Sequence, residues 1–79
     1  MITKTDFKKV VDNAIIDIEC GITGIDVEDY GIHIYGFIDN DDLELKDIVI
    51  SYNNEVIETA EWQRELVKTR LINTYKDSV

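Results

Sequence analysis

The chain has 79 residues, a hydrophobic content of 44% and a formal charge of −9, from 17 acidic and 8 basic residues. A second hydrophobic core would need roughly 50 residues of its own, so residues 1–79 are expected to form one small domain, which excludes a multidomain enzyme. Disordered chains combine high net charge with fewer apolar residues, so a folded domain is expected.

The single cysteine and the N-terminal segment bear on the compartment. Cys20 is the only cysteine, which excludes an intramolecular disulfide and any cysteine-based zinc site, and fits a reducing compartment. Lys4, Lys8 and Lys9 are not followed by a continuous apolar run, and no segment approaches the roughly 18 apolar residues of a membrane span. The expected location is the cytoplasm of the producing cell or of a host cell, with no membrane partner.

The first predicted element is an amphipathic helix that begins near Thr5. Its apolar residues recur at the spacing of one helical face, and they are Phe7, Val10, Val11, Ala14, Ile15 and Ile18. Thr3 or Thr5 is expected to cap the helix, and Gly21 to end it. After Asn13 a second interpretation competes, a short strand starting near Ala14, because apolar residues there also alternate with acidic ones.

A β-hairpin is predicted next. Residues 24–28 alternate apolar and acidic side chains, Asp29-Tyr30-Gly31 has turn chemistry, and residues 32–38 alternate again. In the second strand one face is aliphatic and the other is made by His33, Tyr35 and Phe37. Such a strand is either covered on both sides or presents an aromatic strip to a partner.

Residues 39–42 are predicted to form a loop, followed by a strand over residues 43–52. The apolar alternation changes phase within this strand, which predicts a β-bulge near Lys46-Asp47. Asn53-Asn54 is predicted as a tight turn leading into a short strand over residues 55–58; alternatively, Asn54 caps the last helix directly.

The last predicted element is a helix from Ala60 to about Tyr75, capped by Thr59, with residues 76–79 frayed. An apolar arc on this helix comprises Trp62, Leu66, Val67 and Leu71, while Ile72 and Tyr75 fall outside it. The predicted fold class is therefore α+β: an N-terminal helix, a three- or four-stranded antiparallel meander and a C-terminal helix, arranged as a two-layer sandwich.

The distribution of charge favours a basic protein as the partner. No lysine or arginine occurs between Lys9 and Lys46, whereas ten acidic residues do. Binding a phosphate backbone needs clustered basic residues, so direct binding of nucleic acid is not expected. A surface of one sign attracts and holds a partner of the opposite sign.

No chemical motif survives inspection, so no catalytic residue, cofactor or metal is predicted. Asp39, Asp41 and Glu44 resemble the start of a calcium loop, but Leu43 and Ile50 stand at ligand positions of that pattern. His33 is the only histidine, and Cys20 is expected to be buried filler rather than its catalytic partner.

The sequence thus predicts a small acidic, non-enzymatic protein-binding module. In its most specific form this hypothesis describes a stoichiometric inhibitor, in the producing cell or of phage origin, that mimics nucleic-acid charge and blocks a basic site on a nucleic-acid-binding protein. The predicted partner-binding residues are Asp26, Glu28, Asp29, Asp39, Asp41, Asp42, Glu44, Tyr35 and Phe37. The alternative is a structural subunit that forms a homo-oligomer through the aromatic strand face or the C-terminal helix.

Overall fold

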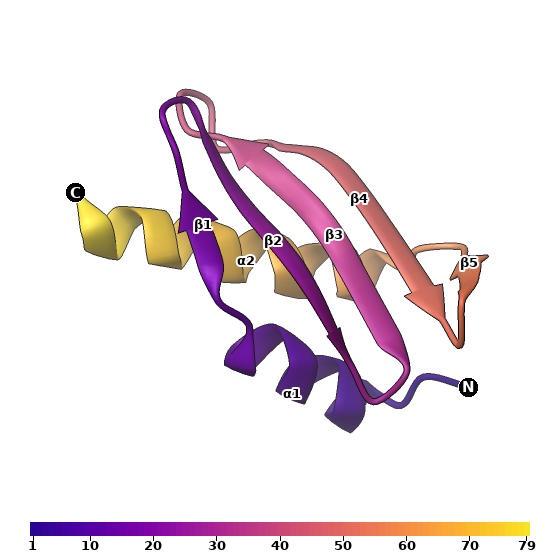
Figure 1. The fold of residues 1–79 in the computed structure, drawn as a ribbon. Coiled ribbons are helices and arrows are strands. Elements are labelled where there is room, and N and C mark those ends of the chain that lie inside the picture. The colour runs from indigo at the N-terminus through magenta and orange to yellow at the C-terminus, as the bar shows by residue number, and fades with distance from the viewer.

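In the computed structural model, which describes residues 1–79, two helices pack against one face of an antiparallel sheet (Figure 1). In chain order the elements are α1 (Lys4–Asn13), β1 (Ile16–Ile18), β2 (Ile22–Asp29), β3 (Ile32–Asp39), β4 (Leu45–Tyr52), β5 (Glu55–Ile57) and α2 (Glu61–Ser78). Each strand pairs with the next, so the sheet is a meander of order β1-β2-β3-β4-β5. The α+β prediction is confirmed, but the sheet has five strands instead of three or four.

Helix α1 is shorter than the helix ending at Gly21 that one of the two interpretations predicted. Thr3 caps it, because the Thr3 hydroxyl accepts a hydrogen bond from the Asp6 N–H at 3.1 Å. The helix ends at Asn13, and Ala14 is already extended, so the interpretation of a helix running to Gly21 is wrong. The competing interpretation, a short strand after Ala14, is confirmed: β1 pairs with β2, which places Ile16 against the core and gives its backbone a hydrogen-bonded partner.

The two tight turns and the bulge occur where the sequence predicts them. Tyr30 and Gly31 both have positive φ, as do Asn53 and Asn54, which is the conformation of two-residue hairpin turns. The register of β3 against β4 shifts between Phe37 and Ile38, opposite the segment 45–47. The bulge near Lys46-Asp47 and the short strand β5 are therefore confirmed.

Helix α2 begins without the predicted threonine cap. Ala60 occupies the cap position, and its N–H donates to the side-chain oxygen of buried Gln63 at 2.8 Å. Thr59 is therefore not the cap. The helix continues to Ser78, beyond the predicted end near Tyr75, while the fraying of residues 76–79 stays a prediction.

The hydrophobic core lies between the sheet and the two helices. Its eleven members are Phe7, Val10, Val11, Ala14, Ile25, Ile32, Ile34, Ile38, Ile50, Val67 and Leu71. Trp62 is half-buried at the margin of this core, where its ring meets that of Phe7 edge-on with centroids 5.2 Å apart. Ile72 also packs against the core although it falls outside the predicted arc.

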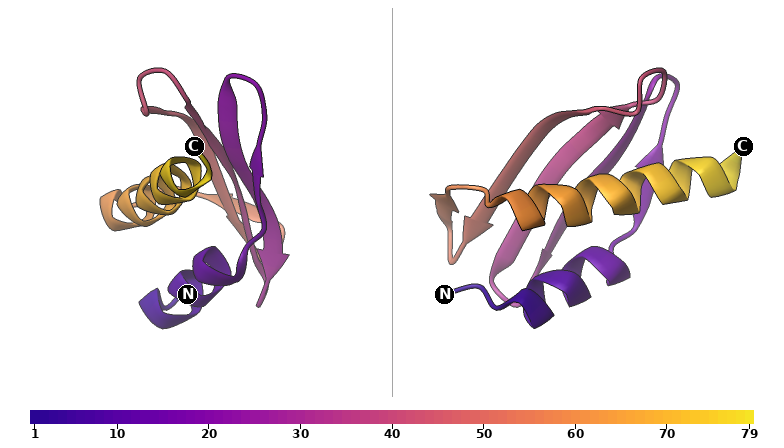
Figure 2. Two further views of the ribbon diagram at one scale, coloured as in Figure 1. Left: turned by 90° about the vertical axis from the view of Figure 1, so that its left-hand side faces the viewer. Right: turned by 180° about the vertical axis from the view of Figure 1, so that it is seen from behind.

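Both helices cover the same face of the sheet, and the other face has no covering layer (Figure 2). Both helices contact β2 and β3, and α2 also contacts the edge strand β1. Neither helix is long and apolar enough to cross a membrane. The uncovered face of the sheet is therefore the largest regular surface that the fold leaves without an intramolecular partner.

Candidate functional site

We call the uncovered side of the sheet the open face. Side chains alternate along each strand, and the strand register places one set of them together on this side. The open face comprises Asp17 of β1, Ile22, Gly24, Asp26 and Glu28 of β2, His33, Tyr35, Phe37 and Asp39 of β3, Asp47, Val49 and Ser51 of β4, and Val56 of β5.

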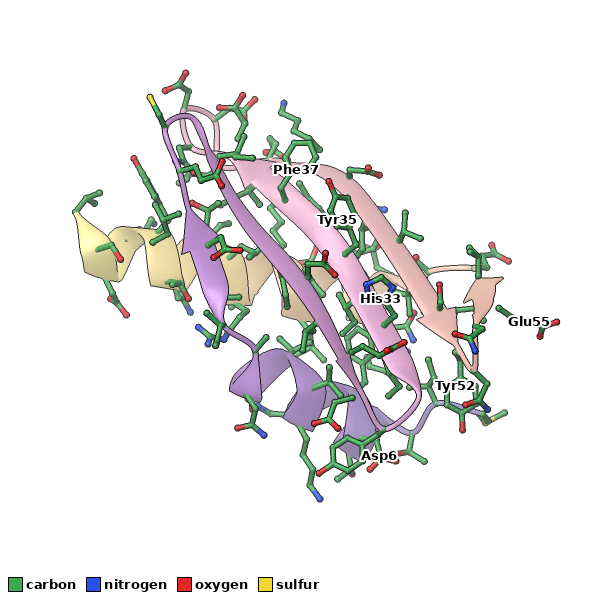
Figure 3. The ribbon with its side chains drawn as sticks, in the orientation of Figure 1. Asp6, His33, Tyr35, Phe37, Tyr52 and Glu55 are labelled. Carbon is green, nitrogen blue, oxygen red and sulfur yellow. The ribbon has the colours of Figure 1, made fainter.

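The centre of the open face is an aromatic and aliphatic strip. His33, Tyr35 and Phe37 follow one another along β3 on the viewer's side of the sheet (Figure 3). Tyr35 lies between Asp26 and Val49 in the register, and its side chain is 40% exposed. Of the two arrangements predicted for this strand, the structure has the second: aliphatic side chains in the core and aromatic ones directed outward.

Carboxylates surround this strip, and the strands contain a single lysine or arginine, Lys46 at the β4 bulge, which pairs with Asp42. The acidic members of the open face are Asp17, Asp26, Glu28, Asp39 and Asp47, all of them exposed except Asp39, which is half-buried. An apolar centre with charged groups at the margin is the usual arrangement of a protein-protein interface. The open face therefore has the composition of an interface with one sign of charge.

Charge is also segregated between the two layers of the molecule. Twelve of the seventeen acidic residues and one of the eight basic residues lie within residues 14–60, the sheet with its loops. The remaining five acidic and seven basic residues lie in the segments that carry the helices. The sheet layer thus has a formal charge of −11 and the helical layer one of +2.

The loop between β3 and β4 contains three of the predicted binding residues, Asp41, Asp42 and Glu44, and part of its charge is neutralised. Lys46 donates a hydrogen bond to Asp42 at 2.7 Å, and Lys68 of α2 reaches Glu44 at 3.4 Å. The Lys46 ammonium, together with the Glu44 N–H, lowers the pKa of Asp42. The Asp42 carboxylate in turn raises the pKa of Lys46. Asp39 accepts the Asp41 N–H at 2.7 Å. The loop is therefore ordered by local bonds, and lysines from outside the base-free segment 10–45 neutralise part of its charge.

A histidine, a carboxylate and a serine lie side by side on three neighbouring strands. His33 Nε2 is 2.7 Å from Asp26 Oδ1, and Ser51 is the residue opposite His33 on β4. The serine makes no hydrogen bond to the histidine, which nucleophilic catalysis requires. The Asp26–His33 pair therefore acts as a polar link between β2 and β3.

Cys20 is exposed in the turn between β1 and β2, so the prediction that it is buried filler is wrong. The cause is the early end of α1, which moves Cys20 from a helix face to a turn. His33 pairs with Glu28, six residues along β2 from Ile22, or about 20 Å of extended strand. The cysteine and the histidine are therefore far apart.

The structure brings together only part of the predicted binding set. Asp26, Glu28, Tyr35, Phe37 and Asp39 share the open face. Asp29 lies at the β2–β3 turn, where its carboxylate accepts the N–H of Tyr30 at 3.0 Å. The remaining members, Asp41, Asp42 and Glu44, lie in the loop that follows the opposite end of β3.

Several open-face residues were not predicted. Asp17, Ile22, Gly24 and Val49 belong to strands whose pairing brings them beside the aromatic strip. Alternation within each strand gives the face of a residue, but the register between strands gives its neighbours. A pairing prediction for β1, β2 and β4 would have been needed to find them.

Comparison with protein-family models, with curated proteins and with solved structures finds no match to this chain. Its function is therefore inferred from the geometry and charge of the open face.

Proposed function

We propose that the chain is a non-enzymatic protein-binding module whose open face binds a basic surface of another protein. The observation that supports this proposal best is the composition of the open face, an exposed aromatic and aliphatic strip bordered by carboxylates, with no arginine and no lysine other than Lys46 at the bulge. The strip contributes apolar burial on binding, and the carboxylates contribute orientation and rapid association.

The charge of the sheet layer favours a different protein over a second copy as the occupant. Two open faces brought together would each carry the −11 charge of their sheet layers, and like charges that face one another across an interface are unfavourable. Helix α2 offers no alternative, because none of its large apolar side chains is fully exposed. The assembly-subunit hypothesis thus has weaker support, and light scattering on the purified protein tests it directly: a monomer contradicts it.

The finer proposal concerns the nature of the basic partner. A positively charged nucleic-acid-binding site is the type of surface to which a dense array of carboxylates is complementary. The module would then act as a stoichiometric inhibitor that occupies the site in place of phosphate groups. This form of the proposal predicts that duplex DNA or RNA displaces the module from its partner.

The proposal is tested by capture from the native cell with two charge-matched double variants. Glu28→Lys with Asp47→Lys changes the open face, whereas Glu65→Lys with Asp77→Lys makes the same net charge change on α2. None of these four side chains makes a hydrogen bond or ion pair, so folding is expected to be preserved in both variants. Circular dichroism verifies this before capture.

The wild type and the α2 variant are expected to retain the same basic protein at low salt, and the open-face variant to lose it. Because exposed charges are screened, retention should fall steeply as ionic strength rises. Equal retention by both double variants, or retention that high salt leaves unchanged, would contradict the proposal.

A further inference from the structure

The open face contains one hollow, and it exists because Gly24 has no side chain. In the register Gly24 lies between Asp17 of β1 and Phe37 of β3, so a side chain is missing from the middle of a row of three. The hollow has a volume of about 200 Å³ and is the only cavity of the molecule. A Cβ on Gly24 would point into this space, 3.3 Å from the Gly36 carbonyl oxygen and 3.5 Å from Phe37 Cβ.

The two sides of the hollow differ in chemistry. Asp17 and Glu19 border the hollow from the β1 side and Tyr35 and Phe37 from the β3 side, while Ile22 and Asp26 lie along β2 on either side of Gly24. One oxygen of Asp26 is held by His33 at 2.7 Å, which leaves its second oxygen without a partner. The hollow is therefore anionic at one wall and offers ring faces at the other.

The size of the hollow limits what it can receive. Pockets for small molecules and cofactors typically measure about 300–1,000 Å³, so this one is too small for them and suits a single side chain. The ligand must be cationic because three carboxylates border the space. Among cationic side chains, the planar guanidinium can stack on an aromatic ring and still donate several hydrogen bonds to carboxylates, whereas an ammonium does not stack.

We propose that the hollow over Gly24 is a specificity pocket for one arginine side chain presented by the basic partner. This inference rests on the proposed function and deepens it by naming the group that the open face recognises. The guanidinium lies against Tyr35 and Phe37 and donates to the carboxylates of Asp17 and Asp26. The aliphatic part of the arginine covers Ile22 at the edge of the hollow.

The direct test uses a small probe, N-acetyl-arginine methylamide, titrated into ¹⁵N-labelled protein. We expect amide shifts centred on Gly24, Tyr35 and Phe37, with a dissociation constant of about 1–10 mM for this single exposed contact. The citrulline analogue, which has nearly the same shape without the charge, and the lysine analogue, which has the charge without the plane, are expected to bind at least about tenfold more weakly.

Variants that fill the hollow give the second arm of the test. Gly24→Ala and Gly24→Val place carbon atoms in the space, and both are expected to weaken arginine binding by tenfold or more. Thr69→Val changes an exposed residue of α2, away from the open face, and is expected to change binding by less than about twofold. Tyr35→Ala removes the exposed ring wall and gives the same loss as Gly24→Val without filling the hollow, should the valine impair folding.

Three outcomes would overturn the inference: equal binding of the lysine or citrulline analogue, shifts centred on the loop 39–44, or an unchanged constant in the Gly24 and Tyr35 variants. The capture experiment separates this failure from that of the proposed function. Capture that is lost in Glu28→Lys with Asp47→Lys but unchanged in Gly24→Val overturns the pocket and supports the binding face. If the pocket binds the arginine probe but the protein captures no basic partner, the proposed function is overturned instead.

Discussion

Arg70 shows how one residue of α2 completes the end of α1, 56 residues earlier in the chain. Its guanidinium donates to the carbonyl oxygen of Val11 at 3.2 Å and to that of Ala14 at 3.0 Å. The last carbonyls of a helix have no partner within the helix, and a cation there also complements the helix dipole. Arg70 therefore caps α1 from outside and joins the two helices.

Replacing Arg70 with methionine keeps most of its length but removes the donors. We expect Arg70→Met to lower the free energy of unfolding by about 1–3 kcal/mol, because hydrogen bonds from a charged group are lost and two carbonyls lose a partner. Arg64→Met, at an exposed position of the same helix, should change stability by no more than about 0.5 kcal/mol. Urea unfolding of the two variants measures the difference, and equal effects would contradict the capping role.

Asp42 gives the stability a dependence on pH. Its pKa is lowered, first by the hydrogen bond from Lys46. A lowered pKa in the folded state stabilises the protein above the ordinary carboxyl value of about 4, and this contribution disappears as the pH falls through the folded-state pKa.

The melting temperature of the wild type should therefore exceed that of Asp42→Asn at about pH 6, and the gap should narrow below about pH 4. The gap is expected to be small and to decrease in salt, because both side chains are exposed. Asp41→Asn is the control, since its side chain has no cationic partner. Melting curves at the two pH values measure the difference in melting temperature between the wild type and each variant. A difference that does not change with pH would show that the Asp42–Lys46 pair adds no stability.

Cys20 is expected to be dispensable for folding because it contributes no side chain to the core. Because its side chain is exposed in a turn, Cys20→Ser should change the free energy of unfolding by less than about 0.5 kcal/mol, not by the 1–3 kcal/mol of a buried hydroxyl without a partner. The native thiol should also react rapidly with a thiol reagent without denaturant. Slow labelling, or a large loss of stability, would contradict its exposure.

At the scale of an element, β3 has two functions on its two faces. Ile32, Ile34 and Ile38 are buried under the helices, whereas His33, Tyr35 and Phe37 face outward. Such a strand reads as fully hydrophobic in sequence, although only one face contributes to the core. Stability and binding should therefore be separable between neighbouring residues.

Phe37→Ala and Ile38→Ala test this separation at adjacent positions. Ile38→Ala should lower the free energy of unfolding by about 2–5 kcal/mol, because it opens a cavity in a fully buried site. Phe37→Ala should lower it by only about 1 kcal/mol, because its half-buried ring packs only on cross-strand neighbours, while partner capture is lost. A cost of about 3–5 kcal/mol for Phe37→Ala would place that ring in the core.

For the whole molecule, the segregation of charge into a sheet layer of −11 and a helical layer of +2 gives it one strongly anionic side. Three of the eight bases already pair with acidic side chains, Lys8 with Asp12, Lys46 with Asp42 and Lys68 with Glu44. The helical layer is therefore too weakly basic to hold a phosphate backbone.

We expect no discrete complex with duplex DNA or RNA at physiological salt and micromolar protein. Electrophoretic mobility shift with a fixed duplex tests this, and addition of the captured basic partner serves as the positive control. A discrete shifted band with the module alone would contradict the assignment of a protein, rather than a nucleic acid, as its ligand.

The sequence by itself determined what depends on near neighbours in the chain. Three features are each set by a few adjacent residues, whose backbone preferences and alternation can be recognised locally. They are the apolar face of α1 up to Asn13, the Tyr30-Gly31 turn and the β-bulge at Lys46-Asp47. Where two local patterns overlapped, at residues 14–18, the sequence left helix and strand open.

The tertiary structure decided what depends on residues far apart in the chain. Pairing of β1 with β2 settled the overlap at residues 14–18 and exposed Cys20. The same pairing, with that of β2 and β3, placed Asp17, Gly24 and Phe37 in one row and so created the hollow. Lys68 and Arg70 found their partners across 24 to 59 residues. Such contacts follow from strand register and helix packing, and these are chosen by burial of the whole core rather than by any local stretch of the chain.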